Sequence, residues 1–166
     1  MSTLDEDLLA VAAALRRRGW RVATAESCTG GMIAARLTDF AGSSDWFERG
    51  FVTYSNDAKV DLLGVTPQTL AAHGAVSEPT ALEMVAGALD RSRAQVAVAV
   101  TGIAGPSGGT AEKPVGTVWF GFVVRGQLPF AVRQHFAGDR AAVRAATVAY
   151  AITRLIDLTE PPGILV

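Results

Sequence analysis

The sequence predicts an α/β protein, a three-layer α/β/α sandwich on a mixed sheet of about five strands. Segments with helical spacing of apolar residues alternate with short apolar runs over most of the chain. That alternation is typical of folds in which helices cover both faces of a sheet. Near the C-terminus two apolar runs, 116–124 and 128–136, are separated by a short turn and indicate an antiparallel hairpin. Together these patterns predict a mixed sheet of ordinary size.

The composition fits a single compact domain over residues 1–166. Hydrophobic residues make up 49% of the 166 positions and charged residues 19%, which argues against disorder. A net charge of −1 gives no basic footprint for nucleic acid or an anionic membrane. One cysteine cannot form an internal disulfide, and no Cys/His cluster indicates a metal site. With no basic–apolar leader and no long apolar stretch, we expect a cytoplasmic protein.

The elements are predicted from caps and periodicity, in chain order. Thr3 is expected to cap the first helix, with Glu6 completing a capping box and Gly19 ending the helix. The further elements follow in this order: a strand over 21–25, a helix over about 30–38, a strand over 47–55, a helix capped by Ser55 or Asn56 and ending at 63, helices starting at Thr66–Pro67 and at Ser77, a buried strand over 95–101, the hairpin, and a last helix from Arg140 to about 158. The tail, 160–166, is expected to be loose.

The turn after the first strand is the main candidate for chemistry. An apolar run ends at Ala25 and gives way to Glu26-Ser27-Cys28-Thr29-Gly30-Gly31 before the next helix. Such a turn exposes a hydroxyl or thiol together with free backbone N–H groups. A serine before a helix ordinarily serves as its cap, but Thr29 is available for that task, and the glycines allow close approach of a ligand.

Cys28 is the alternative nucleophile at this turn. A lone cysteine is ordinarily a small buried hydrophobe. A Cys–His pair would need His73 or His135, and neither lies in a pattern that indicates catalysis. Ser27 is therefore ranked above Cys28, provided that a base is found for it.

Lys59 is the candidate for the base that Ser27 needs, and Tyr54 lies close to it in the sequence. The strand expected to end at Tyr54 is followed by Ser55-Asn56-Asp57-Ala58-Lys59, which places Lys59 about one turn into a helix. A lysine ordinarily stays solvated on a helix surface, but burial can lower its pKa until it acts as a base. Serine, lysine and tyrosine at one sheet edge can perform acyl transfer without histidine or metal.

Two further segments are candidates for ligand binding. The glycine-rich segment 101–109 follows a buried strand, where α/β sheets bind ligands, but it matches neither a P-loop nor G-x-G-x-x-G. Arg140 begins the last helix and could clamp a phosphate or carboxylate, although a surface arginine is its ordinary role.

Five segments in order carry a family resemblance. They are TAESCTGG (24–31), YSNDAK (54–59), GAVS (74–77), TGIAGPSGG (101–109) and KPVGTV (113–118). With them the chain resembles the C-terminal domain of the CinA proteins, the nicotinamide-nucleotide amidohydrolase family, in a stand-alone form without the CinA N-terminal domain. The resemblance implies hydrolysis of nicotinamide mononucleotide (NMN) to nicotinate mononucleotide and ammonia in pyridine nucleotide salvage.

The resemblance also implies the roles of residues. Ser27 would be the nucleophile, with Lys59 and Tyr54 beside it, no metal or cofactor, and a homo-oligomeric assembly. Tyr54 would relay the serine proton or donate it to the leaving ammonia. We expect the substrate to contact Thr29, Gly30, Gly31, Asn56, Thr101, Gly105, Gly108 and Arg140. Two alternatives stay open at this point: a nucleotide-binding module without turnover, and a cysteine amidase acting on another amide.

Overall fold

A mixed five-stranded sheet forms the centre of the computed structural model, which describes residues 1–160. Its strands are β1 (Val22–Glu26), β2 (Phe47–Val52), β3 (Val96–Gly102), β4 (Thr117–Val124) and β5 (Phe130–His135), in the spatial order β2-β1-β3-β4-β5. β1 pairs in parallel with β2 and β3, whereas β3–β4 and β4–β5 are antiparallel. The predicted mixed sheet and C-terminal hairpin are confirmed.

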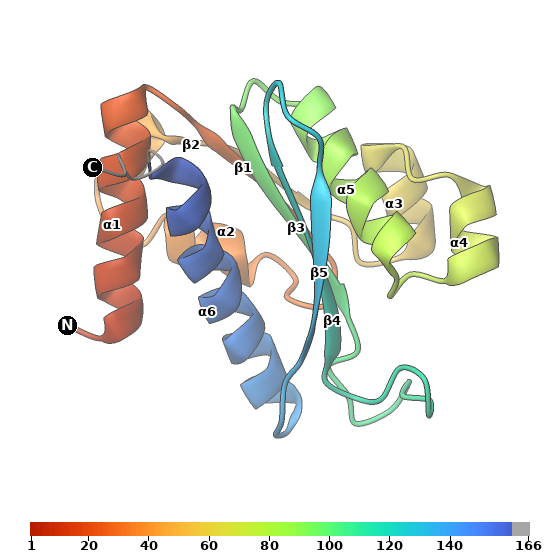
Figure 1. Ribbon diagram of the computed structural model, residues 1–166. Helices are drawn as coiled ribbons and strands as arrows, with labels where there is room; N and C mark the ends of the chain where they lie inside the picture. The colour runs from red at the N-terminus through yellow and green to blue at the C-terminus, as the bar shows by residue number, and fades with distance from the viewer. Residues whose placement is uncertain (161–166) are drawn as a thin grey trace, which may run out of the picture.

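Helices cover both faces of the sheet, so the predicted three layers are confirmed (Figure 1). One layer holds α1 (Thr3–Arg18), α2 (Met32–Leu37) and α6 (Arg140–Thr159), and the other holds α3 (Asn56–Leu63), α4 (Pro67–His73) and α5 (Glu78–Asp90). A short 3₁₀ turn, Ser43–Asp45, precedes β2. Two hydrophobic clusters fill the spaces between the layers.

Side-chain size differs between the two faces of the sheet. In β3 the valines 96, 98 and 100 point into the cluster under α1 and α6, and the alanines 97 and 99 into the cluster under α5. Alternation with period two is the geometry of a strand. The small residues let α5 pack closely: a Cβ at Gly121 would lie 2.5 Å from the carbonyl oxygen of Ala81. Gly87 of α5 likewise leaves room only for the backbone of Leu63, which fixes α3 and the residues it carries.

The helix caps are those predicted from the sequence, except that the cap of α1 lies one residue earlier. Ser55, Thr66, Ser77 and Asp139 each accept a backbone N–H of the following helix, as predicted. The capping box of α1 was placed one residue too late. Ser2 is the cap, because the Asp5 N–H donates to its hydroxyl at 3.2 Å and the Asp5 carboxylate accepts the Ser2 N–H at 2.9 Å.

Boundaries of the other elements agree with the sequence to within about two residues. The main exceptions are β2, which ends at Val52 rather than 55, and α2, which is shorter than predicted and begins at Met32. Glu160 follows α6, and its N–H donates to the Ile156 carbonyl at 2.9 Å. The rest of the tail predicted to be loose, 161–166, lies outside the described residues.

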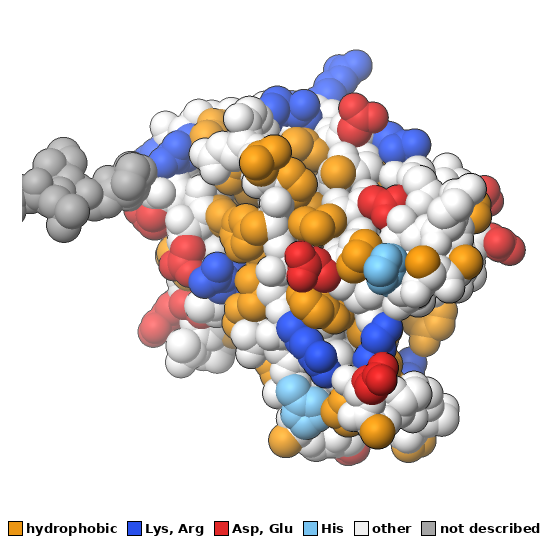
Figure 2. All heavy atoms as spheres, turned by 45° about the vertical axis from the view of Figure 1, so that its right-hand side comes forward, with side chains coloured by type: hydrophobic (Ala, Val, Ile, Leu, Met, Phe, Trp, Pro, Cys, Tyr) orange, Lys and Arg blue, Asp and Glu red, His pale blue; other side chains and the backbone are white. Residues whose placement is uncertain are grey.

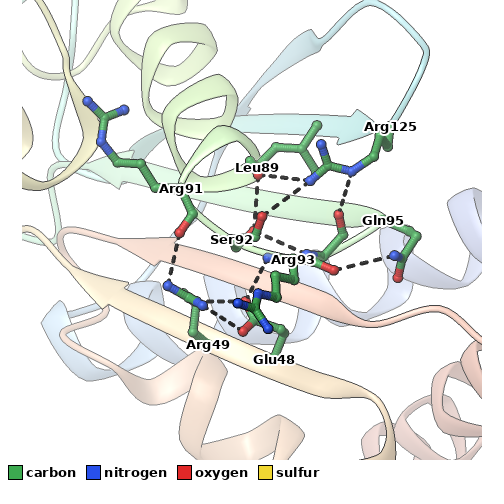
Figure 3. Close-up of polar contacts among 9 residues, drawn as sticks. Glu48, Arg49, Leu89, Arg91, Ser92, Arg93, Gln95 and Arg125 are labelled. Atoms are coloured by element: carbon green, nitrogen blue, oxygen red, sulfur yellow. Dashed lines mark hydrogen bonds and ion pairs between the residues drawn. The ribbon is translucent and has the colours of Figure 1, made fainter.

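Arginines clamp the end of the sheet at which β1 and β3 begin (Figure 3). Arg125 donates to the carbonyls of Leu89, Ser92 and Ala94 at 3.0, 3.4 and 2.9 Å. Arg49 donates to the Arg91 carbonyl at 3.0 Å. Both side chains hold the connection between α5 and β3. The sequence patterns gave no indication of this clamp.

The surface offers scattered apolar groups. Figure 2 shows hydrophobic side chains among charged ones on one face. Leu128, in the turn before the edge strand β5, is 89% exposed, whereas Trp46 is 1% exposed and belongs to the core. Over the described part of the chain, no helix combines the length and apolarity needed to cross a bilayer. Assembly into a homo-oligomer stays a prediction.

Candidate active site

The nucleophile turn, residues 26–31, joins β1 to α2 at the carboxyl end of the parallel strands. The Ser27 N–H donates to the Val100 carbonyl at 3.1 Å, which keeps the turn aligned with β3. Gly30 and Gly31 have φ of +57° and +102°, a region that favours glycine. The predicted strand–turn–helix is therefore present, with the Ser27 side chain at its bend.

Glu26 holds this turn from inside the protein. Its buried carboxyl group accepts the N–H groups of Ile33 and Ala34 at 2.8 and 3.1 Å and the Thr29 hydroxyl at 2.5 Å. The carboxyl group thus caps α2, where Gly31 at the cap position has no side chain for the task. Thr29, which by sequence was available as the cap, does not cap this helix. Ser27 is not a cap either, and its hydroxyl is left for other contacts.

Lys59 reaches Ser27. Its Nζ lies 3.0 Å from Ser27 Oγ, 3.0 Å from the Thr53 carbonyl oxygen and 3.1 Å from that of Tyr54. The lysine is only 1% exposed, and this burial lowers its pKa because the charged form loses hydration. The first turn of α3, capped by Ser55, brings the lysine under the end of β2.

All three partners of Lys59 accept from it in the structure: Nζ donates to Ser27 Oγ and to the carbonyls of Thr53 and Tyr54, while the Ser27 hydroxyl donates to the Tyr54 carbonyl at 3.4 Å. When Lys59 is neutral, the two carbonyls keep the two N–H groups of its –NH₂. Its lone pair then faces Ser27, whose O–H can donate to it. Among residues 1–160, no acidic side chain forms an ion pair with Lys59. The arrangement can remove a proton from Ser27 as that residue attacks an electrophile.

Tyr54 joins the site through its backbone and not through its hydroxyl. The side chain is 59% exposed, and the hydroxyl accepts a hydrogen bond from Arg140 Nη2 at 3.0 Å. In the described part of the chain, that hydroxyl has no hydrogen bond with Ser27 or Lys59. The proton-relay role of Tyr54 therefore stays a prediction, whereas its carbonyl directly holds Lys59.

A cavity of about 650 Å³ lies at the start of α6 and is lined by two arginines that contact the site: Arg140 bonds the Tyr54 hydroxyl, and Arg144 bonds the carbonyls of Cys28 and Thr29. Arg140 also donates to the Gly105 carbonyl at 3.0 Å. Arg144 follows one turn later on α6. Cations at the start of a helix oppose its dipole, so the pair suits a ligand that is an anion. The lining residues are Ala104, Pro106, Val115, Gly138, Asp139, Arg140, Ala141 and Arg144.

The other residues predicted to contact the substrate differ in whether their side chains are already hydrogen-bonded within the protein. The hydroxyls of Thr29 and Thr101 are committed to Glu26 and to the Ala75 carbonyl, so neither side chain is free as it stands. Asn56 is exposed at the start of α3. Gly105 and Gly108 adopt φ of +87° and +93° in the loop after β3. Their contacts with a substrate stay predictions.

Cys28 points away from the chemistry. It is 6% exposed and belongs to the hydrophobic cluster under α1 and α6. Burial raises the pKa of its thiol to about 11, which disfavours the reactive thiolate. Over residues 1–160, neither His73 nor His135 forms a hydrogen bond with it. The geometry favours Ser27 over Cys28 as the nucleophile.

Sequence and structure comparisons identify the family of the chain. The profile of the CinA C-terminal domain family matches residues 5–159. The chain belongs to this family. It is 58% identical over 145 residues to the nicotinamide-nucleotide amidohydrolase PncC of Escherichia coli K12, covering 87% of this chain and 88% of that protein.

Two further relatives extend the comparison. The protein of the same name from Enterobacter agglomerans is 55% identical over 149 residues, covering 90% of this chain and 91% of the relative. The crystal structure of competence/damage inducible protein CihA from Agrobacterium tumefaciens superposes with a TM-score of 0.93 at 49% identity, covering 96% of this chain and 98% of that chain. The predicted family resemblance is confirmed.

Proposed function

We propose that this protein hydrolyses the carboxamide of NMN to nicotinate mononucleotide and ammonia, with Ser27 as nucleophile and Lys59 as base. Its relatives named nicotinamide-nucleotide amidohydrolase make it an amidohydrolase. The observation that carries the mechanism is the 3.0 Å contact between Ser27 Oγ and the buried Nζ of Lys59. A lysine with a lowered pKa beside a serine is an activated nucleophile.

Acylation begins when Ser27 Oγ attacks the carboxamide carbon and its proton passes to Lys59 Nζ. Negative charge then develops on the carboxamide oxygen. The N–H groups of Thr29 and Gly31 have no protein acceptor among residues 1–160 and are the proposed donors to this oxyanion. Such a donor lowers a barrier by about 3 kcal/mol in other enzymes.

The tetrahedral intermediate then collapses toward products. The C–N bond breaks as the Lys59 ammonium returns its proton to the leaving nitrogen, which departs as ammonia. Water attacks the nicotinoyl ester, with Lys59 again taking a proton. Breaking the ester C–O bond releases the acid, and the proton on Lys59 restores the Ser27 hydroxyl. The sum is amide plus water giving acid plus ammonia.

We place the 5′-phosphate of NMN against Arg140, in the cavity that this arginine lines. Arg140 lies there, bonded to the Gly105 carbonyl and the Tyr54 hydroxyl. A phosphate accepts charge-assisted hydrogen bonds more strongly than either group, so it can replace them. We place the reaction in pyridine nucleotide salvage in the cytoplasm, since this phosphorylated substrate does not cross membranes unaided.

The test uses purified protein with NMN and follows ammonia and nicotinate mononucleotide together. We expect both products in equal amounts from the wild-type protein and neither from Ser27→Ala. Nicotinamide riboside, which lacks the phosphate, should react with a much higher KM. Saturable binding of NMN without ammonia would instead establish a nucleotide-binding module.

A further inference from the structure

We infer that Arg144 is a positioning residue that orients the oxyanion-binding peptide of the nucleophile turn. This inference rests on the proposed function and concerns a residue outside the predicted set. Arg144 lies on α6, yet its Nε donates to the Cys28 carbonyl at 3.1 Å and its Nη2 to the Thr29 carbonyl at 3.4 Å. One guanidinium group thus bonds two consecutive peptide units, Cys28–Thr29 and Thr29–Gly30.

Peptide geometry turns this contact into an orientation of N–H groups. In a trans peptide the carbonyl of one residue and the N–H of the next point in opposite directions. Since Arg144 draws the Cys28 carbonyl toward α6, the Thr29 N–H must point away from α6. A flip of this peptide would turn the carbonyl toward the substrate and remove the donor.

Thr29 is restrained at every group except that N–H. Its hydroxyl donates to Glu26 at 2.5 Å, and its carbonyl accepts from Arg144 and from the Met32 N–H, the latter at 3.0 Å. Over residues 1–160 the Thr29 N–H donates to no protein group. The residue is 0% exposed, so this N–H is a buried donor without a protein partner, and it must become accessible when the substrate carbonyl binds at Ser27.

The glycines of the turn explain why such a restraint is needed. Gly30 and Gly31 reach left-handed φ values without strain, and the same freedom makes other peptide orientations accessible. The Gly30 N–H is already used, because it donates to the Ser27 carbonyl at 3.0 Å. Through the Thr29 carbonyl, Arg144 restrains the peptide that leads into these glycines, and through the Cys28 carbonyl it restrains the peptide before it, from a helix more than 100 residues later.

The structure offers a matched control in Arg125. It also donates to several carbonyls of a turn, at the opposite end of the sheet (Figure 3). A purely structural clamp lowers stability without a selective effect on kcat. Arg144→Ala, Arg144→Lys and Arg125→Ala should therefore be compared for kcat, KM and the temperature of unfolding. Arg144→Lys keeps the charge in the cavity, but one ammonium cannot reproduce the fork that holds two carbonyls.

For NMN we expect kcat to fall about 100-fold in both Arg144 variants, the loss typical of one oxyanion donor. KM should stay within about threefold in Arg144→Lys, and millimolar guanidinium should partly restore kcat in Arg144→Ala. Arg125→Ala should keep kcat and KM while unfolding at a lower temperature. A raised KM with unchanged kcat in Arg144→Lys would overturn the inference and make Arg144 a substrate-binding residue.

A second readout separates this inference from the choice of substrate. p-Nitrophenyl acetate acetylates an activated serine whatever the natural amide is, and its tetrahedral intermediate needs the same N–H donors. We expect Ser27-dependent acetylation that is slower in Arg144→Ala than in wild type and Arg125→Ala. If wild type acetylates but releases no ammonia from NMN, only the proposed substrate fails. Equal acetylation rates in wild type and Arg144→Ala would overturn the inference itself.

Discussion

The two ends of the sheet use the same interaction for different purposes. At the end where β1 and β3 begin, Arg125 and Arg49 hold backbone carbonyls of the α5–β3 connection at the surface. At the other end, Lys59 and Arg144 hold the carbonyls of residues 53, 54, 28 and 29. A cation bound to carbonyls is therefore not by itself a sign of catalysis.

Three features distinguish the end of the sheet proposed to be catalytic. The Lys59 amine is buried, since this residue is 1% exposed, and the Ser27 hydroxyl is among its partners. A cavity of about 650 Å³ is lined by Arg144, which bonds the carbonyls of the turn. At the opposite end Arg49 and Arg125 are exposed, and their acceptors among residues 1–160 are backbone carbonyls and the Glu48 carboxylate. Burial beside a hydroxyl is the feature on which the proposed role of Lys59 as a base rests.

The largest effect should come from removing either member of the buried pair. We expect Ser27→Ala and Lys59→Met each to lower kcat by at least about 1,000-fold, and the double variant to be no worse than either, because the two act as a unit. Initial rates of ammonia release from NMN provide the measurement. Additive losses in the double variant would show that Lys59 acts independently of Ser27.

A change of KM should follow from substitution in the cavity. Arg140→Ala removes a charged donor to the proposed phosphate site, so we expect KM for NMN to rise about 10- to 100-fold with kcat largely kept. The same variant should have little effect on the reaction of nicotinamide riboside. An equal loss with both substrates would remove Arg140 from the phosphate site.

Tyr54→Phe distinguishes two roles for one hydroxyl. If the hydroxyl only positions Arg140, its loss should change KM about fivefold, the value of one ordinary hydrogen bond. If it relays the proton, kcat should fall about 100-fold. From the 3.0 Å contact with Arg140 we expect the first result, and steady-state kinetics with NMN would decide.

The pH dependence of stability should report the buried lysine. Its folded pKa is lowered by burial, so between that pKa and the ordinary lysine value only the unfolded chain holds the proton. Stability therefore rises with pH across this interval, by up to about 1.4 kcal/mol per pH unit; below it Lys59 contributes no pH dependence, because both the folded and the unfolded chain hold the proton. Denaturant unfolding of wild type minus Lys59→Met isolates the slope, because other groups cancel. No difference in slope would mean that Lys59 titrates normally.

The smallest effect is expected at Cys28. Cys28→Ala removes a buried sulfur, so we expect a loss of about 1 kcal/mol in stability with kcat within about twofold. The contact with Arg144 persists, since it uses the backbone carbonyl of residue 28. Activity should also survive iodoacetamide near neutral pH, because the thiol pKa is about 11. Loss of activity in Cys28→Ala, but not in Ser27→Ala, would move the nucleophile to the cysteine.

Local sequence patterns were enough to predict the parts of the site that follow directly after a strand. Ser27 follows β1 and Lys59 lies one turn after β2, and because these strands are parallel neighbours their ends meet at one edge. The first capping box was misplaced because Ser2 and Thr3 are both good caps and Asp5 and Glu6 are both acidic. Because neighbouring residues are equally suited to each position of the capping box, the sequence alone does not determine which of them forms it.

Contacts between distant segments were not predictable in the same way. Glu26 and Arg144 complete the turn, yet neither was a candidate, because their partners depend on how α2 and α6 pack. The spacing of Arg140 and Arg144, one helical turn apart at the start of α6, was the available indication that both face the same site. The direction of the Tyr54 hydroxyl depended on Arg140, 86 positions further along the chain.

The buried carboxyl group of Glu26 has a consequence for the order of folding. It ends a central strand at 1% exposure, and its acceptors are satisfied only when the Thr29 hydroxyl and the first N–H groups of α2 are in place. Burial of this group without those donors would cost several kcal/mol. The strand end and the helix that follows it should therefore form as one cooperative unit, so that the turn with the proposed nucleophile Ser27 is assembled in the same step that closes the core.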